Sequence, residues 1–264
     1  MTGIRPIRAA GRLGALVLVL GVAACAAPRE GGTAADGSAI DPLEPVNRPI
    51  FEFNMALDKA VLRPTARAYS HVPAPMRGRV GDFLGNLSAP LWMVNQGLQG
   101  RFGEAAETGF WFLINSTIGF GGLVDLAEAE GITRHDEDFG QTLAVWGVSD
   151  GAYLMLPILG PSNVRDGVGR AVDAFMDPFP RHVEDGTSYA RTGVKAIHKR
   201  EQLLGKLERM EETSVDFYAA VRSLYRQNRG DEIRNGAPDP AGSGANYDLE
   251  EMLEQSEPAG EEPQ

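Results

Sequence analysis

The sequence is poor in the residues that carry metal and redox chemistry. Its 264 residues include one cysteine and four histidines. A single cysteine excludes an internal disulfide framework and any Cys-rich zinc or iron–sulfur site. We therefore expect no metal and no bound cofactor.

A net positive charge is also missing. The chain has 25 Lys and Arg against 36 Asp and Glu, which gives a formal net charge of −11 at pH 7. Nucleic-acid binding needs a clustered basic face, so we expect no nucleic-acid partner. Hydrophobic residues make up 43% of the chain, which is ordinary for a folded domain and excludes global disorder.

After residue 40 the chain has no long uninterrupted apolar run. Its longest uncharged stretches, 83–100 and 108–124, are broken by Asn, Gln, Ser, Gly or Pro. A membrane-spanning helix needs about 20 consecutive apolar residues, so neither stretch is a good candidate. Two interpretations remain open. The stretches form a buried globular core, or they form helices lying within one membrane leaflet, with Trp at headgroup depth and polar groups facing a wet interior.

The N-terminus has the layout of a secretory signal peptide. Three arginines precede an apolar run over residues 13–20, and small residues lead to Cys25. The Val22-Ala23-Ala24-Cys25 sequence resembles a bacterial lipobox. This resemblance implies cleavage before Cys25, which would carry S-diacylglycerol and an N-acyl group, and Ala26 implies sorting to the outer membrane. The alternative is a plain signal peptide with an idle cysteine.

Composition divides the chain into four parts. We expect a lipoprotein signal peptide at 1–24, a lipidated flexible tether at 25–40, a helical domain at 41–230 and an acidic disordered tail at 231–264. The tail holds ten acidic residues against one arginine.

The body is predicted to be all-α. Asp41 should cap the first helix, with Pro42 at its first position and Glu44 closing a capping box. Arg63-Pro64 should end or kink that helix. Residues 153–159 read as a short extended segment broken by Pro157. Apolar spacing predicts further helices near 65–71, 75–87, 90–99, 103–117, 138–147, 163–175, 188–208 and 211–228.

Short catalytic patterns are weak. Residues 147–151 match G-x-S-x-G, but a nucleophile elbow needs a strand before the serine and a helix after it, and a helical pattern precedes Ser149. We expect no enzyme activity. A lipid hydrolase that uses Ser149 is kept as an alternative.

Several longer motifs resemble the MlaA/VacJ family, in register from about 41 to 180 and more weakly to about 228. They are Asp41-Pro42-Leu43-Glu44-Pro45-Val46-Asn47-Arg48, Phe51-Glu52-Phe53-Asn54, Gly85-Asn86-Leu87, Val94-Asn95, Arg101, Phe112-Leu113-Ile114-Asn115-Ser116-Thr117-Ile118-Gly119, Gly121-Gly122-Leu123-Val124-Asp125, Asp138-Phe139-Gly140-Gln141-Thr142-Leu143, Trp146-Gly147-Val148 and Leu156-Pro157-Ile158-Leu159-Gly160-Pro161-Ser162.

The resemblance implies an all-helical, ring-shaped body partly embedded in the inner leaflet of the outer membrane, lipid-anchored on the periplasmic side. Through a central amphipathic channel such a protein removes mislocalised phospholipids from the outer leaflet and so maintains lipid asymmetry. The implied partners are phospholipids, trimeric porins and a periplasmic lipid carrier that feeds an inner-membrane ABC transporter. A porin-associated structural scaffold that moves no lipid is the alternative.

The same resemblance suggests site residues. Candidates for channel or lipid contact are Asn95, Asn115, Ser116, Thr117, Arg191 and Lys195. Residues 119–140 would form a gating loop, and the motif of Asn47, Arg48, Phe51 and Asn54 would clamp that loop or the ring. Further signature residues of the gate are Gly119, Gly121, Gly122, Asp125, Phe139 and Gly140.

Overall fold

We describe residues 41–132, 135–179 and 185–237 of a computed structural model of the chain. The predicted signal peptide, Cys25, the predicted tether and the part of the predicted tail after residue 237 lie outside these ranges. The fold is all-α apart from one small hairpin, as predicted. No helix in the described ranges has the length and apolar character needed to cross a bilayer.

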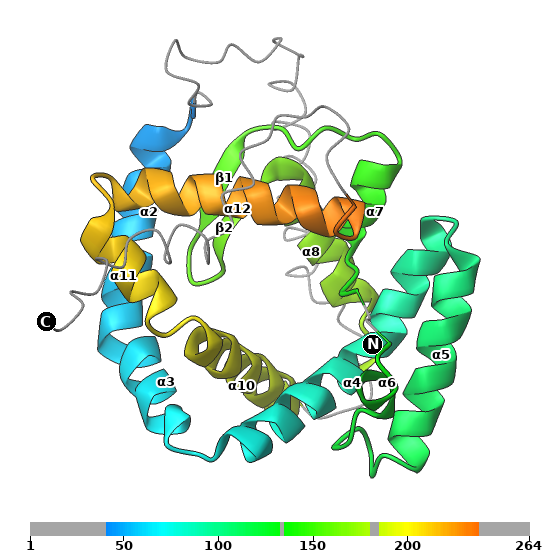
Figure 1. Cartoon of the computed structure of the whole chain (residues 1–264). Coiled ribbons are helices and arrows are strands. Elements are labelled where there is room, and N and C mark those ends of the chain that lie inside the picture. The colour runs from blue at the N-terminus through cyan, green and yellow to red at the C-terminus, as the bar shows by residue number, and fades with distance from the viewer. Residues whose placement is uncertain (1–40, 133–134, 180–184, 238–264) are drawn as a thin grey trace, which may run out of the picture.

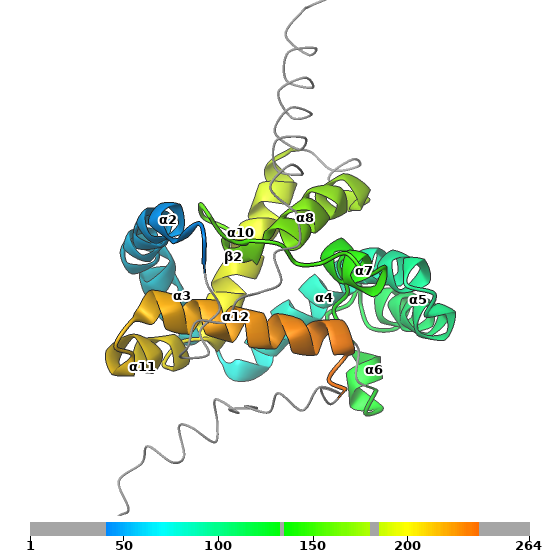
Figure 2. The same cartoon turned by 90° about the horizontal axis from the view of Figure 1, so that it is seen from above.

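The helices follow a closed, ring-like circuit (Figure 1). Its elements in chain order are α2 (Glu44–Leu57), the π-helix η1 (Asp58–Leu62), α3 (Arg63–Ser70), α4 (Ala74–Leu98), α5 (Phe102–Thr117), α6 (Leu126–Ala129), α7 (Phe139–Val145), β1 (Tyr153–Leu156), β2 (Gly160–Asn163), α8 (Val164–Met176), α10 (Asp185–Gln202), α11 (Lys206–Thr213) and α12 (Phe217–Arg234). Figure 2 shows that α8 and α10 rise steeply from the layer that contains α3, α4 and α12.

The predicted start of the first helix is wrong. The helix begins at Glu44, and its N-cap, Leu43, makes no side-chain capping bond. The Asp41 carboxylate instead accepts hydrogen bonds from the Leu43 N–H and the Asn47 side chain, and from the Tyr218 hydroxyl of α12. The Asp41 carboxylate, which the local pattern assigned to helix capping, therefore takes part in a long-range contact with α12.

One predicted helix break is a change of helix type, and another is absent. At Arg63-Pro64 the helix continues through η1, whose wider turn ends with the Arg63 N–H bonded to the Asp58 carbonyl. Pro64 falls in the first turn of α3, where a missing N–H is tolerated. The helices predicted at 75–87 and 90–99 are one helix, α4, which contains Pro90 and packs against α5, α7 and α10. Tertiary packing overrides the local effect of this proline.

Two further breaks were missed, and one element was only half predicted. Gly205 adopts φ +80° and separates α10 from α11, where one helix over 188–208 was expected. Residues 214–216 separate α11 from α12, where one helix over 211–228 was expected. The extended segment at 153–159 is confirmed as β1, but it pairs antiparallel with β2, which the pattern did not reveal.

Polar side chains make up much of the buried interior. The apolar core cluster is small: Phe51 of α2, Tyr153 and Met155 of β1 and Tyr218 of α12. Many large apolar side chains are exposed instead, including Phe102, Phe110, Leu113, Ile118 and Phe120 on and after α5. The interpretation of residues 108–124 as a globular core is therefore wrong, because this stretch turns much of its apolar surface outward.

Candidate functional site

The N-terminal motif joins the first helix to the hairpin. The Asn47 side chain is buried. It donates to the Tyr153 carbonyl (3.0 Å) and accepts from the Met155 N–H (2.9 Å). Two turns further along the helix, Asn54 repeats this pattern with the Leu156 carbonyl and the Ile158 N–H. The two asparagines thus form side-chain hydrogen bonds with the backbone of β1 and of the turn that follows it. They lie on the opposite side of the ring from α6, in the 119–140 segment (Figure 1).

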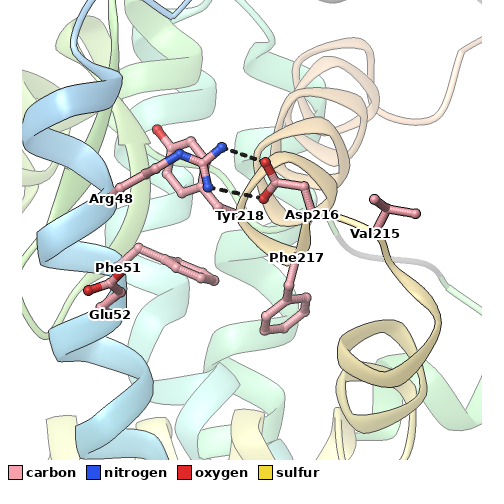
Figure 3. A pocket seen from close by; sticks show the side chains of 7 residues that line it. All are labelled: Arg48, Phe51, Glu52, Val215, Asp216, Phe217 and Tyr218. Atoms are coloured by element: carbon pink, nitrogen blue, oxygen red, sulfur yellow. Dashed lines mark hydrogen bonds and ion pairs between the residues drawn. The ribbon is translucent and has the colours of Figure 1, made fainter.

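The same motif meets the last helix and closes the ring at a seam. Arg48 forms an ion pair with Asp216, the N-cap of α12 (Figure 3), and a second ion pair with Glu44. The hydrogen bonds that Arg48 donates to these two carboxylates raise its pKa. Below the pair, the Phe51 ring packs edge-on against Phe217 and Tyr218 at centroid distances of 5.6 and 5.5 Å. A cleft of about 400 Å³ lies between α2 and the start of α12.

Removing the Asn47 amide should destabilise the seam. Asn47→Ala is expected to lower the free energy of unfolding by about 1–2 kcal/mol, because it leaves the Met155 N–H and the Tyr153 carbonyl without their partner. Asn54→Ala should have a smaller effect, since that site is only part-buried and water can replace the amide. Urea denaturation measures both. An equal loss of unfolding free energy in the two variants would contradict the explanation that burial makes Asn47 the more important of the two.

Three of the four candidate channel residues on α4 and α5 hold helix junctions instead. Asn95 is fully buried. It donates to Asp173 of α8 and accepts from the Thr142 hydroxyl of α7. Asn115, also buried, donates to Asp125 and accepts from the Leu126 N–H. Ser116 accepts from the Asn86 amide. Asn95 and Asn115 therefore cannot line an open path in this structure.

The fourth, Thr117, is exposed on α5, and its hydroxyl donates to the Leu113 carbonyl one turn earlier. This bond satisfies the hydroxyl within its own helix. The Thr117 side chain can therefore lie in an apolar environment, and its hydroxyl is not available to line a polar channel.

The start of the predicted gating loop is fixed against α4 and α5. Gly122 has φ +88°, and a Cβ there would lie 2.4 Å from the Asn86 Cβ. Gly119 and Gly121 belong to the same turn, and Asp125 caps the short helix α6 by accepting the Ala127 and Glu128 N–H groups. Residues 133–134 of this stretch lie outside the described ranges.

Its other end is fixed by a charged junction between α7, α8 and α12. The Phe139 N–H donates to Asp173, and the Phe139 ring lies edge-on to Trp146. A Cβ on Gly140 would lie 2.6 Å from both Arg229 Nη2 and Asp166 Oδ1. The Arg229 guanidinium bridges Asp166 and Asp138 at 2.9 and 2.6 Å. Gly140 leaves room for this bridge.

Two cations on α10 differ in their surroundings. Arg191 is engaged: it pairs with Asp177 (2.9 Å), contacts Ser88 of α4 and lies over the Phe179 ring. Lys195, one turn later, is solvent-exposed. Desolvation by the surrounding protein nevertheless lowers its pKa, which nearby Asp136 partly opposes. Lys195 is thus exposed to solvent and has charges of both signs near it.

The sequence interpretation missed the residues that fix α10 and α12. Arg200 of α10 binds the buried Asp58 of η1 at 2.6 Å, and Arg229 of α12 binds Asp166. Both arginines occur in ordinary charged helix faces, so no local signal distinguishes them from solvated residues. The Ser149 alternative gains no support: Ser149 is exposed in the connection between α7 and β1, and no strand precedes it within the described ranges.

Comparisons with known proteins identify relatives along most of the chain. Residues 39–232 match the MlaA lipoprotein family. The intermembrane phospholipid transport system lipoprotein MlaA of Escherichia coli is 35% identical over 83% of this chain and 88% of its own length. The Haemophilus influenzae protein of the same name is 32% identical over 74% and 80%.

A relative in Rickettsia bellii is 37% identical over 72% of this chain and 75% of its own length. A solved structure concerned with the maintenance of bacterial outer membrane lipid asymmetry superposes with a TM-score of 0.66 at 34% identity. It covers 74% of this chain and 99% of the solved one. With a helical ring that matches that structure and a family match over residues 39–232, the chain belongs to the MlaA lipoprotein family.

Proposed function

We propose that this chain is an outer-membrane lipoprotein, anchored on the periplasmic side through acyl groups on Cys25, that removes phospholipids from the outer leaflet. The lipid passes its headgroup through the helical ring and is handed to a periplasmic carrier. Porin trimers hold the ring in the membrane. The named relatives, which are intermembrane phospholipid transport lipoproteins, support the class of function.

The exposed apolar surface supports placement of the ring within one leaflet. Phe110 and Leu113 of α5 and Phe175 of α8 are more than half exposed, and exposure of such large apolar side chains to water is unfavourable. Hydrocarbon around the ring would remove this surface from water, as it does for helices that lie in a membrane interface.

The family match over residues 39–232 is the observation that carries the transport proposal. Within the ring, the exposed Lys195 of α10 is the candidate contact for the phosphate of the headgroup, because its ammonium attracts an anion. Arg191 and Lys199 add positive charge near it and Asp136 and Asp177 add negative charge, so the local charge is mixed.

Surface-exposed phospholipid in cells lacking the gene tests the function. We expect accumulation in the outer leaflet, reversed by the wild-type gene and by Ser149→Ala but not by Cys25→Ala. No accumulation would favour the porin-associated scaffold and contradict transport. Failure of Ser149→Ala to complement, together with lysophospholipid release by the wild type, would favour the hydrolase.

Charge reversal of Lys195 tests the headgroup path. Lys195→Glu should fail to clear surface phospholipid, whereas Lys195→Arg should retain most clearance because it keeps the positive charge. Arg209→Glu, a reversal at an exposed position on α11, is the matched control and should complement fully. Equal complementation by Lys195→Glu and Arg209→Glu would remove Lys195 from the path.

A further inference from the structure

The turn of the β-hairpin has an unusual backbone. Leu156 pairs with Gly160, so residues 157–159 form a three-residue turn. The Leu159 N–H donates to the Pro157 carbonyl at 2.8 Å, and Ile158 between them has φ +68°. An i to i+2 hydrogen bond around a residue with positive φ is characteristic of the rare, strained γ-turn.

Isoleucine is an unfavourable residue for this position. Positive φ brings a branched Cβ against the backbone, and such conformations persist where the surrounding structure imposes them, often at functional sites. Glycine or asparagine would adopt the turn with less strain. Gly160, two residues later, also has a positive φ, and glycine adopts it without strain. Ile158 has no such freedom.

The strained residue is also displayed to the outside. Ile158 is 69% exposed and Leu159 is 61% exposed, so neither gains much from packing in the fold. No charged residue occurs over 151–164. Phe53, which precedes Asn54 in α2, is also more than half exposed. The tip therefore combines a strained backbone with exposed apolar side chains. Exposure of these side chains to water is unfavourable.

Side chains from two helices hold the turn in this form. Asn54 donates to the Leu156 carbonyl and accepts from the Ile158 N–H, at 2.9 and 2.8 Å. On the other strand, Arg170 of α8 donates to the Leu159 and Pro161 carbonyls. Polar backbone groups at an exposed turn ordinarily bind water, but these are bonded within the protein. Hydrocarbon requires such internal bonding, and water does not.

We propose that the tip formed by Ile158 and Leu159 inserts among lipid acyl chains and anchors the rim of the ring in the bilayer. Two exposed branched apolar side chains, an uncharged hairpin and internally bonded backbone groups together fit hydrocarbon. A protein partner would not need those backbone groups to be bonded in advance. The proposal rests on placement of the ring within a leaflet, as in the proposed function.

Fluorescence quenching by doxyl-labelled lipids tests insertion. The full chain is reconstituted in vesicles of phosphatidylethanolamine and phosphatidylglycerol, with nitrobenzoxadiazole on a cysteine introduced by Leu159→Cys. Parallel samples carry the label through Leu113→Cys on α5 or Asn228→Cys, an exposed position on the polar helix α12. The unaltered chain, treated identically, gives the background from Cys25.

We expect strong quenching at positions 159 and 113 and little at 228. Quenching at 113 without quenching at 159 would overturn the insertion of the tip while leaving the embedded ring intact. No quenching at either position would overturn both. Quenching at 159 but not at 113 would support the tip and contradict the embedding of α5.

A substitution that relieves strain gives an independent test. Ile158→Asn should raise Tm in detergent by a few degrees, because asparagine tolerates the left-handed backbone. It should also reduce the quenching of the probe at position 159 at least twofold, because the tip then carries a polar group. A lower Tm would contradict the inferred strain, and unchanged quenching would contradict the role of Ile158.

Discussion

Arg229→Met is expected to lower the free energy of unfolding by about 3–5 kcal/mol, because it leaves a buried carboxylate without its main counter-charge. The Arg229 side chain is 9% exposed and that of Asp166 is 3% exposed, and the two are 2.9 Å apart. Thermal or urea denaturation of the purified protein measures the loss. Arg209→Met, at an exposed position, should change stability by less than about 0.5 kcal/mol.

The loss should also depend on pH. Burial acts to raise the pKa of Asp166, but hydrogen bonds from Arg229 and Tyr225 outweigh it, and the pKa is lowered. The stabilising contribution is therefore complete above the unfolded pKa of about 4 and is lost as pH falls through the folded value. In Arg229→Met the burial effect is opposed less, so the pKa of Asp166 rises. The difference between the two proteins should narrow as the medium is acidified.

A double-mutant cycle separates the pair from its surroundings. Asp166→Asn combined with Arg229→Met should be less destabilising than the sum of the two single changes, since neither charge then remains buried alone. Strict additivity would mean that the two groups are not coupled. It would contradict the assignment of Arg229–Asp166 as the link between α12 and α8.

Gly169→Ala should destabilise the protein by about 3 kcal/mol, at the upper end for overpacking. A Cβ at Gly169 would lie 2.4 Å from the Gly140 nitrogen and 2.7 Å from its Cα. Both atoms are backbone, so no side chain can rotate away, and α7 and α8 must separate. Denaturation midpoints in urea would report the change.

Gly167→Ala provides the matched control on the same helix. No heavy atom lies within 4 Å of a Cβ at that position, so the substitution should instead stabilise the helix by roughly 0.5–1 kcal/mol. Opposite signs two residues apart are the expected result. An equal loss of stability in both variants would contradict the assignment of the loss at position 169 to the α7–α8 contact.

The sequence located most helices because apolar spacing and punctuation by Gly and Pro act locally. Phe102–Thr117 and Val164–Met176 lie within a residue or so of the ranges predicted for them. The errors at Asp41, Pro90 and Gly205 have different causes. The Asp41 carboxylate is used by α12, Pro90 is held by the packing of α4, and Gly205 sits within a pattern that continues on both sides.

The candidate site was recovered by resemblance more than by residue chemistry. Asn47 and Asn54 hold the junction between α2 and the β-hairpin. A polar residue in a helical pattern does not by itself predict such a junction. Asn95 and Asn115 were assigned to a channel because they interrupt apolar helices. The structure instead uses them as buried hydrogen-bonding partners between helices. A polar residue in an apolar helix can either line a channel or bond to a neighbouring helix. The spacing of residues in the sequence does not distinguish these two roles.

The sequence by itself determined the helical class, the lack of a spanning helix in the described ranges and the family, since each depends on composition, periodicity or ordered motifs. Only the tertiary structure decided which apolar faces turn outward and which charges are buried. It also strained the backbone at Ile158. These properties depend on contacts between segments far apart in the chain. The Asn54 side chain, for instance, fixes a turn more than a hundred residues away.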